Sequence, residues 1–341
     1  MSPLTAWADS WYRSTPSAIL LRYLLAPLSG GFIFASALRR LAYRCGCLRV
    51  ERLPVPVIVV GNLTVGGTGK TPLVLWVVER LRAAGRHPGI VSRGHGGSAH
   101  APQRVLPDSD PVHCGDEPVL LARRAGVPVW IGARRAEAGR ALLAAHPDTD
   151  VIVCDDGLQH YALARDIEIA VLDAARGLGN GWRLPAGPLR EAPDRLACVD
   201  AVVLNGQPRV ALPALPQATF TMHLRAGAFV NLGDPGLRAE AARFRARPVH
   251  AVAGIGHPQR FFASLAELGI DAIPHAFPDH HAYAPADLPP GTVLMTEKDA
   301  VKCAAFGRDD LWALGVDACV DEGLQRLIIE RLKTLHGQQT A

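Results

Sequence analysis

The stretch PVPVIVVGNLTVGGTGKTPLVLWVVERLRAAG, residues 54–85, decides the fold. Residues 54–61 are a short run rich in β-branched apolar residues, which predicts a buried parallel strand. A glycine-rich loop follows, and residues 70–85 predict a helix that ends at Gly85. A glycine-rich loop between a buried strand and a helix is typical of a phosphate-binding loop, because its backbone N–H groups and the helix N-terminus both face the anion.

We therefore predict that this loop binds a nucleotide. Lys70 would reach the β- and γ-phosphates, and Thr71 would hold Mg²⁺. The strict pattern G-x-x-x-x-G-K-[ST] requires glycine at position 64, where this chain has Thr64. Other glycines remain in the loop, so the physical argument stands. The predicted nucleotide-binding residues are Gly61, Asn62, Leu63, Thr64, Val65, Gly66, Gly67, Thr68, Gly69, Lys70 and Thr71.

A pair of acids supplies the second half of such a site. The apolar run DVIVCDD, residues 150–156, predicts a strand that ends at Asp155 and Asp156. Open α/β sheets bind ligands at the carboxyl ends of their strands. One carboxylate can hold Mg²⁺, since hard cations prefer oxygen ligands, and its neighbour can orient or deprotonate a nucleophile.

Strands and helices continue to alternate along the chain, which predicts an α/β fold with a P-loop NTPase-like doubly wound sheet. Residues 95–126 are expected to form a polar loop. The other strands and the helix of this part are predicted at 87–94, 127–132, 166–173, 199–206 and 133–146. Beyond them, two possible linking strands are predicted at 219–224 and 229–232.

A second, smaller α/β run begins near residue 248. It predicts a strand at 248–256, a helix at 258–269, a strand at 291–299 and a C-terminal helix near 323–337. We place the boundary near residue 225. The predicted domains are an N-terminal segment 1–50, a kinase-like core 51–225 and a C-terminal domain 226–341 that closes over the nucleotide.

The N-terminal segment is apolar and basic. From Ser10 to Val50 it holds six arginines and no acidic residue. Pro27 and Gly30-Gly31 divide it into two apolar runs, which predict two short helices lying in the bilayer interface. Thr15-Pro16 would begin the first of them. A buried helical hairpin and a signal peptide are the alternatives.

The bulk composition excludes several classes. The formal net charge is only +4, which does not indicate a nucleic-acid partner. The seven cysteines contain no CxxC pair, so neither a disulfide framework nor a structural zinc site is expected. No protein partner is evident.

The motifs together resemble the tetraacyldisaccharide 4'-kinases of lipid A biosynthesis. The matching pieces run in that family's order, and Thr64 matches the family's own phosphate loop. They are VGNLTVGGTGKTP at 60–72, SRGHGG at 92–97, GDEP at 115–118, CDDGLQH at 154–160, LPAGPLRE at 184–191, FPDHH at 277–281 and TEKDAVK at 296–302.

This resemblance implies transfer of the γ-phosphate of ATP to the 4'-hydroxyl of a tetraacylated glucosamine disaccharide 1-phosphate. It implies ATP and Mg²⁺ as cofactors, a lipid-linked disaccharide and the membrane surface as partners, and peripheral docking on the cytoplasmic face of the inner membrane.

The resemblance also implies residue roles. Asp116 looks like the family's candidate base, with His280 as its partner, although His281 stands beside it. Asp155 looks like the metal-associated acid and Asp156 like the acid near the reacting groups, and which acid accepts the proton stays open. Arginines would grip the 1-phosphate in bidentate fashion, and the candidates are Arg93, Arg134 and Arg190, with Arg135 and Arg183 as further possibilities.

Two other classes compete with this interpretation. One is a regulatory P-loop GTPase or metallochaperone ATPase. TEKD resembles the guanine-reading N-K-x-D element but departs from it, because Thr296 replaces asparagine and Lys298 stands one place late. A non-catalytic membrane-anchored binding protein would not need the acid pair beside the phosphate loop.

Overall fold

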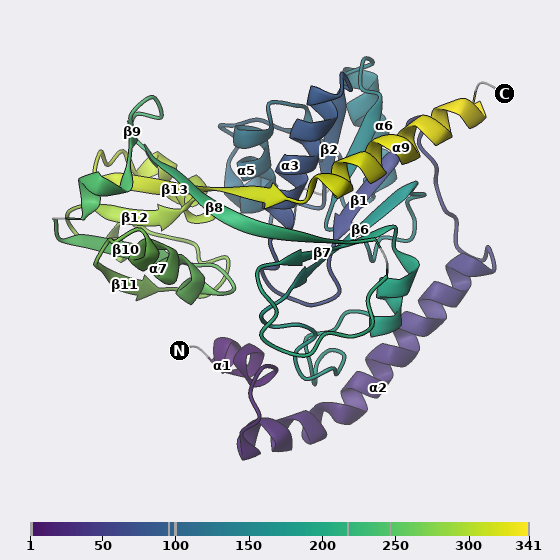
Figure 1. Cartoon of the computed structure of the whole chain (residues 1–341), viewed down its shortest axis with the longest axis horizontal. Coiled ribbons are helices and arrows are strands. Elements are labelled where there is room, and N and C mark those ends of the chain that lie inside the picture. Colours follow the sequence, from purple (N-terminus) through teal and green to yellow (C-terminus); the bar gives the residue numbers. More distant parts are fainter. Residues whose placement is uncertain (1–2, 95, 99–100, 217, 246, 340–341) are drawn as a thin grey trace.

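A computed structural model describes residues 3–94, 96–98, 101–216, 218–245 and 247–339. Within these residues, thirteen strands join into one sheet with the order β11-β10-β12-β13-β8-β7-β6-β1-β5-β2-β4-β3, and β9 pairs with β8 (Figure 1). The strands are β1 Val57–Gly61, β2 Pro88–Ser92, β3 Gln103–Val105, β4 Val129–Ile131, β5 Val151–Asp155, β6 Ile167–Asp173, β7 Ala201–Asn205, β8 Thr219–Asn231, β9 Arg238–Ala239, β10 Val249–Ala253, β11 Ala272–Ala276, β12 Val293–Thr296 and β13 Leu311–Val320. The α-helices are α1 Pro3–Ser10, α2 Pro16–Arg44, α3 Lys70–Ala83, α4 Pro111–Cys114, α5 Asp116–Ala125, α6 Arg135–Ala145, α7 Pro258–Glu267, α8 Glu297–Cys303 and α9 Glu322–Gln339.

The predicted doubly wound sheet is confirmed. Strand β1 lies in parallel between β5 and β6, and all five of its residues are buried. One face of the central strands packs against apolar side chains of α3, α5 and α9, and the other against α6 and the irregular chain that follows β5. Burial on both faces explains why β1 and β5 are continuous apolar runs without alternation.

Three local predictions were wrong. The region expected to be a polar loop contains α5, which begins after Gly115 and carries Asp116 and Glu117 in its first turn. The two linking strands are one strand, β8. The strand predicted at 291–299 ends at Thr296, because the Thr296 hydroxyl accepts a hydrogen bond from the Asp299 backbone N–H and caps α8.

Strand β8 joins the larger and smaller parts of the sheet. Its start pairs in parallel with β7, and its remaining length pairs antiparallel with β13. The two long strands cross the middle of the molecule in Figure 1 and carry the smaller sheet of β10, β11 and β12 at one end. Arg225, at the predicted boundary, lies inside β8 opposite Asp317, so the chain passes between the two parts within a strand. The proposed division into domains stays a prediction.

The two apolar runs of the N-terminal segment form one long helix, α2, preceded by the short α1, which corrects the prediction of two short helices there. Helix α2 runs unbroken through Pro27, and Thr15 caps it with Pro16 in the first turn, as predicted. Proline and glycine inside a helix cost about 3 and 1 kcal/mol, and tertiary packing commonly outweighs such costs. Here Ala18 and Ser29, on either side of Pro27, are both buried against the body. Within the described residues α2 is the one helix long and apolar enough to cross a membrane.

Candidate active site

The phosphate loop occupies the carboxyl end of β1, as the sequence predicts. Gly66 and Gly69 have φ angles of 110° and 94°, which only glycine adopts without strain. A Cβ atom on Gly69 would also lie 2.6 Å from the Asn205 side-chain nitrogen. The Asn62 side chain donates hydrogen bonds to the Gly66 carbonyl and to the Thr68 hydroxyl, at 3.4 and 3.1 Å. These contacts hold the loop open toward α3, whose first residue is Lys70.

The departure at position 64 has a structural reason. Thr64 is buried and forms an antiparallel bridge with Leu189. It pairs there with residues 183–190, which we call the strap. The Val65 backbone N–H donates to the Pro188 carbonyl at 2.8 Å, and the Arg190 N–H donates to the Leu63 carbonyl at 2.7 Å. A β-branched residue suits this extended pairing better than glycine does.

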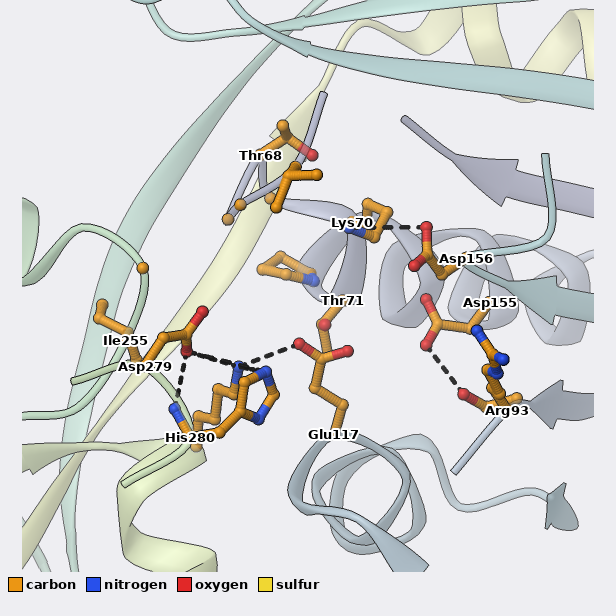
Figure 2. A pocket seen from close by; sticks show the side chains of 18 of the residues that line it. Thr68, Lys70, Thr71, Arg93, Glu117, Asp155, Asp156, Ile255, Asp279 and His280 are labelled. Carbon is orange, nitrogen blue, oxygen red and sulfur yellow. Dashed lines mark hydrogen bonds and ion pairs between the residues drawn. The ribbon is translucent and has the colours of Figure 1, made fainter. Parts of the chain in front are cut away.

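A large cavity opens in front of the loop. Its volume is about 930 Å³. Its walls come from the phosphate loop, the carboxyl ends of β2 and β5, the strap, α5, α7 and α8, and from the inner face of α2. Figure 2 shows Lys70 directed toward Asp156 on one side of the cavity, with Asp279 and His280 on the other.

Asp155 is a buried carboxylate at the end of β5. Its Oδ2 accepts a hydrogen bond from the Ser92 hydroxyl at 3.2 Å, and its Oδ1 has no partner. Burial raises the pKa of Asp155 to about 7, and the nearby Glu117 and Asp156 charges add to this, against the lowering effect of Lys70. A buried oxygen without a partner, facing a phosphate loop, is suited to a cation.

Asp156 has an uncommon backbone conformation, and two cations contact its carboxylate. Its φ angle is 47°, which is uncommon for a residue with a side chain. Arg190 contacts both of its oxygens, at 2.9 and 3.0 Å, and Lys70 Nζ lies 3.8 Å away. Burial alone would raise the pKa of Asp156, but Lys70 and Arg190 outweigh it and the pKa falls below its ordinary value. Asp156 therefore stays ionised and fixes the direction of Lys70.

Asp116 and His280 meet beside the cavity, although 164 positions separate them; His280 lines the cavity, whereas Asp116 is 5% exposed and lies behind its wall. His280 Nδ1 lies 3.0 Å from Asp116 Oδ2. This hydrogen bond raises the pKa of His280, against burial and the Lys298 charge. Burial acts to raise the pKa of Asp116, but its contacts with His280, Lys298 and Lys302 lower it overall. His281 bonds instead to Asp287 at 3.1 Å and is absent from the cavity wall, so the structure places His280 in the site.

Sequence reasoning missed several charged residues of the cavity, among them Glu117, Asp279 and Lys298. Lys298 Nζ lies 3.1 Å from Glu117 Oε1, 3.2 Å from Asp279 Oδ1 and 3.3 Å from His280 Nε2. The surrounding carboxylates raise the pKa of Lys298 despite its burial, so it remains charged. These three residues belong to the quoted motifs GDEP, FPDHH and TEKD, which were the available signal.

The predicted substrate arginines lie in different places. Arg93 and Arg190 line the cavity. The Arg134 side chain is 77% exposed and pairs with Glu137, outside the cavity wall, which corrects its assignment. Arg134 is the residue before the first turn of α6, so its side chain points to solvent, whereas Arg135 one step along is 4% exposed and lines the cavity.

The residues at the loop fit a magnesium ion better than a transition metal. The Thr71 hydroxyl, the unpaired Asp155 oxygen and the Glu117 carboxylate line one cavity, and all are hard oxygen donors. No cluster of three His, Cys, Asp or Glu side chains with metal-binding geometry occurs in the described part of the chain. Mg²⁺ is commonly coordinated by one or two carboxylates together with substrate phosphates, and these oxygen donors match that coordination.

A phosphate loop, an acid pair at the end of the adjacent strand and a cavity that joins them to His280 and Lys298 define a P-loop phosphotransferase. The comparisons with known proteins agree: residues 21–333 match the family described as tetraacyldisaccharide-1-P 4'-kinase. The chain belongs to this family, and it is a kinase.

Two curated relatives show how far the similarity extends. The tetraacyldisaccharide 4'-kinase of Azoarcus sp. (strain BH72) is 54% identical over 337 residues, covering 98% of this chain and 97% of the relative. That of Dechloromonas aromatica (strain RCB) is 52% identical over 324 residues, covering 94% of each.

A solved structure extends the comparison to the fold and the nucleotide. The crystal structure of LpxK from Aquifex aeolicus in complex with ATP superposes with a TM-score of 0.79 at 30% identity, over 92% of this chain and 99% of that one. The resemblance, the fold class and the assignment as a kinase are confirmed, and ATP binding is supported. The GTPase, metallochaperone and non-catalytic alternatives were wrong.

Proposed function

We propose that the cavity transfers the γ-phosphoryl group of Mg²⁺-bound ATP to the 4'-hydroxyl of a tetraacyl glucosamine disaccharide 1-phosphate. The observation that carries this proposal is the composition of the cavity wall, which joins Lys70 of the phosphate loop to Phe32, Ser36 and Arg40 on the inner face of α2. An apolar helix beside the phosphate site suits an acceptor whose head must react while its acyl chains remain in lipid.

The nucleotide end of the reaction follows from the loop. The backbone of residues 61–69 cradles the phosphates, and Lys70, aligned by Asp156, neutralises charge on the group in transfer. Thr71 and Asp155, with Glu117 beside them, would hold Mg²⁺, which supplies charge neutralisation on the phosphate oxygens when bound. The partnerless Asp155 oxygen supports this placement.

The acceptor end involves the Asp116–His280 pair. The lowered pKa of Asp116 keeps it ionised. Of the pair only His280 lines the cavity, and a sugar hydroxyl that reaches the pair would donate a hydrogen bond to Asp116, which would orient it. His280 and Lys298 hold Asp116 and balance its charge. In a loose transition state the hydroxyl proton leaves late, so a weak base in the right place is sufficient. Arg93 and Arg135, both in the cavity wall, are our candidates for the 1-phosphate. Arg190 is committed to Asp156.

The acceptor assignment is tested with ATP labelled in its γ-phosphate and the disaccharide 1-phosphate in mixed micelles. We expect label in the lipid, with ATP preferred over GTP. Hydrolysis of ATP without labelling of the lipid would contradict the proposal.

A prediction for the pair concerns the pH behaviour of His280. Asp116→Asn removes the contact that raises the His280 pKa, so this pKa should fall toward or below its ordinary value. Loss of the orienting carboxylate should lower kcat by about 10²-fold. NMR titration of the imidazole gives the pKa independently of activity, and Asp148→Asn, at an exposed acid, is the matched control. An unchanged His280 pKa would contradict the proposed pairing of Asp116 with His280.

We propose that α2 seats the enzyme peripherally on the cytoplasmic face of the inner membrane. One face of α2 packs on the protein body at Ala18 and Ser29, so the helix lies along the body rather than standing apart as a free span. Its outer face exposes a row of large apolar side chains: Leu20, Tyr23, Leu24, Leu28, Phe34, Leu38 and Leu41. The arginines 39, 40, 44 and 49 near its end would attract anionic headgroups.

Charging this row should release the enzyme from lipid. The double substitution Leu24→Glu and Leu28→Glu replaces side chains that are 67% and 62% exposed, so the fold should survive. We expect vesicle binding to fall at least about 10-fold, since lost apolar burial is worth roughly 25 cal/mol per Å² and two charges are added. ATP affinity should not change. Leu106→Glu, at an exposed leucine of another surface, is the control. Wild-type binding that resists both high salt and alkaline carbonate would refute peripheral docking.

A further inference from the structure

Ser29 is a buried polar residue on an otherwise exposed helix. It is 1% exposed, while its neighbour Leu28 is 62% exposed. Burying a hydroxyl in such a place is unfavourable unless its hydrogen bonds are satisfied. The hydrogen-bond partners of Ser29 therefore show which segment this face of α2 contacts.

Both hydrogen bonds of the Ser29 hydroxyl go to the strap. Ser29 Oγ donates to the Arg183 carbonyl at 2.9 Å and accepts from the Ala186 N–H at 3.0 Å. A serine inside a helix more often bonds to a carbonyl of its own preceding turn. Here the hydroxyl reaches a segment more than 150 positions away, so α2 and the strap are tied at one point.

The far end of the strap is tied to the phosphate loop. Pro188 and Leu189 pair with Val65 and Thr64, and the Arg190 side chain grips Asp156, which aligns Lys70. The strap thus lies between the helix that faces the lipid and the loop that binds the phosphates. In Figure 1 the long α2 passes beside the irregular chain between β6 and β7, which contains the strap.

The strap is closely packed between its two ends. The Asn180 side chain donates to the Ala186 carbonyl at 2.9 Å, and a Cβ atom on Gly187 would lie 2.2 Å from the Asn180 side-chain oxygen. Trp11, which is 4% exposed, donates from its indole N–H to the Pro185 carbonyl at 3.2 Å. These contacts leave the chain between Ala186 and Pro188 little room to deform.

We propose that Ser29 is a positioning residue for phosphoryl transfer: through the strap, the membrane-facing helix sets the position of the phosphate loop and of the Lys70–Asp156 pair. Ser29 touches no reacting atom. It acts through geometry, and a misplacement of about 1 Å by a distant substitution can lower a rate by up to about 10²-fold. The expected effect of Ser29 on kcat rests on the proposed function, whereas its expected effect on ATP binding does not.

The test compares Ser29→Ala with Ser29→Thr, which keeps the hydroxyl, and with Ser17→Ala, the same change at an exposed position of α2. Measurements are ATP affinity by calorimetry, kcat per titrated active site on the micellar lipid, and vesicle binding. We expect Ser29→Ala to weaken ATP binding at least threefold and to lower kcat about 10-fold, with vesicle binding unchanged. Ser29→Thr should recover most of both losses, and Ser17→Ala should equal the wild type.

Several results would overturn the proposal. One is an ATP affinity and a kcat in Ser29→Ala within twofold of the wild-type values. Another is a loss of total activity that comes only from a smaller number of active sites, with a normal rate at each site. A Ser29→Thr enzyme no better than Ser29→Ala would also contradict it. Should Ser29→Ala fail to fold, Trp11→Phe decides, because it removes the bond to Pro185 and keeps an aromatic ring against Trp7. It should weaken ATP binding and lower kcat about threefold, and a neutral result would refute the coupling.

A failure of the acceptor assignment can be told apart from a failure of this inference. If the wild-type enzyme does not phosphorylate the disaccharide lipid, the proposed function falls. The difference in ATP affinity between Ser29→Ala and Ser29→Thr still tests the coupling in that case.

Discussion

Lys70→Ala should lower kcat by on the order of 10³-fold and leave the protein folded. Lys70 is the first residue of α3, and its ammonium group is held over the phosphate site by Asp156 at 3.8 Å. A preorganised cation acts on charge that develops during transfer, so its removal affects the transition state more than the ground state. The expected signature is a collapse of kcat with a smaller change in the KM for ATP.

The control for this result is Lys333→Ala, which removes an exposed lysine of α9. Thermal unfolding of both variants should match the wild type within a few degrees. Turnover of Lys70→Ala within 10-fold of wild type would remove this lysine from the reaction and with it the role given to the phosphate loop.

Asp155→Asn should abolish most of the activity while making the protein more stable. The carboxylate is 1% exposed, and its charge is unfavourable in the absence of a cation. Loss of a metal-holding carboxylate should lower kcat by roughly 10²-fold or more. The Mg²⁺-dependent part of ATP affinity should shrink in the same variant, which tests the metal role without an activity assay.

The stability effect has a definite pH dependence. The folded-state pKa of Asp155 is about 7, above its value in the unfolded chain, so the folded protein holds this proton more tightly. The contribution of this group to folding stability is fully present below about pH 4, where the carboxyl is protonated in both the folded and the unfolded chain. That contribution is lost as the pH rises through 7 and the buried group ionises. Asp155→Asn removes this loss. Its Tm should therefore exceed that of the wild type by at least about 3 °C at pH 8, with a smaller difference at pH 5.

Asp148→Asn, at an exposed acid before β5, should change neither property. A wild-type Tm in Asp155→Asn at pH 8, or a fall in Tm, would show that the buried carboxylate is satisfied by the protein itself and would contradict the metal assignment.

The parts of the fold that depend on local patterns could be predicted. Strand β1, its loop and α3 follow from a β-branched run and from glycines that the loop conformation requires. Helix α5 was missed because it begins after Gly115 without a side-chain cap and carries Pro118 in its first turn. Helix α2 was divided in error at Pro27, since the packing face that keeps it whole depends on contacts with the strap.

The candidate site also could be predicted from local patterns only in part. Asp155 and Asp156 could be placed from their position after an apolar run. The contact between Asp116 and His280 could not, because no spacing rule connects residues so far apart, and only the resemblance suggested it. Arg134 was preferred to Arg135 without knowledge of the helix phase, which turns one to solvent and the other to the cavity. Nothing in the sequence marks Ser29, since its role arises from burial.

The central claim is that this cavity phosphorylates the 4'-position of a lipid-borne disaccharide. The most direct test is NMR analysis of the lipid product made by the purified enzyme from ATP and the disaccharide 1-phosphate. We predict two phosphomonoester signals in ³¹P spectra, with proton–phosphorus correlations that place the new group at the 4'-carbon. A second phosphate at any other position, or a diphosphate at the 1-position, would contradict the account.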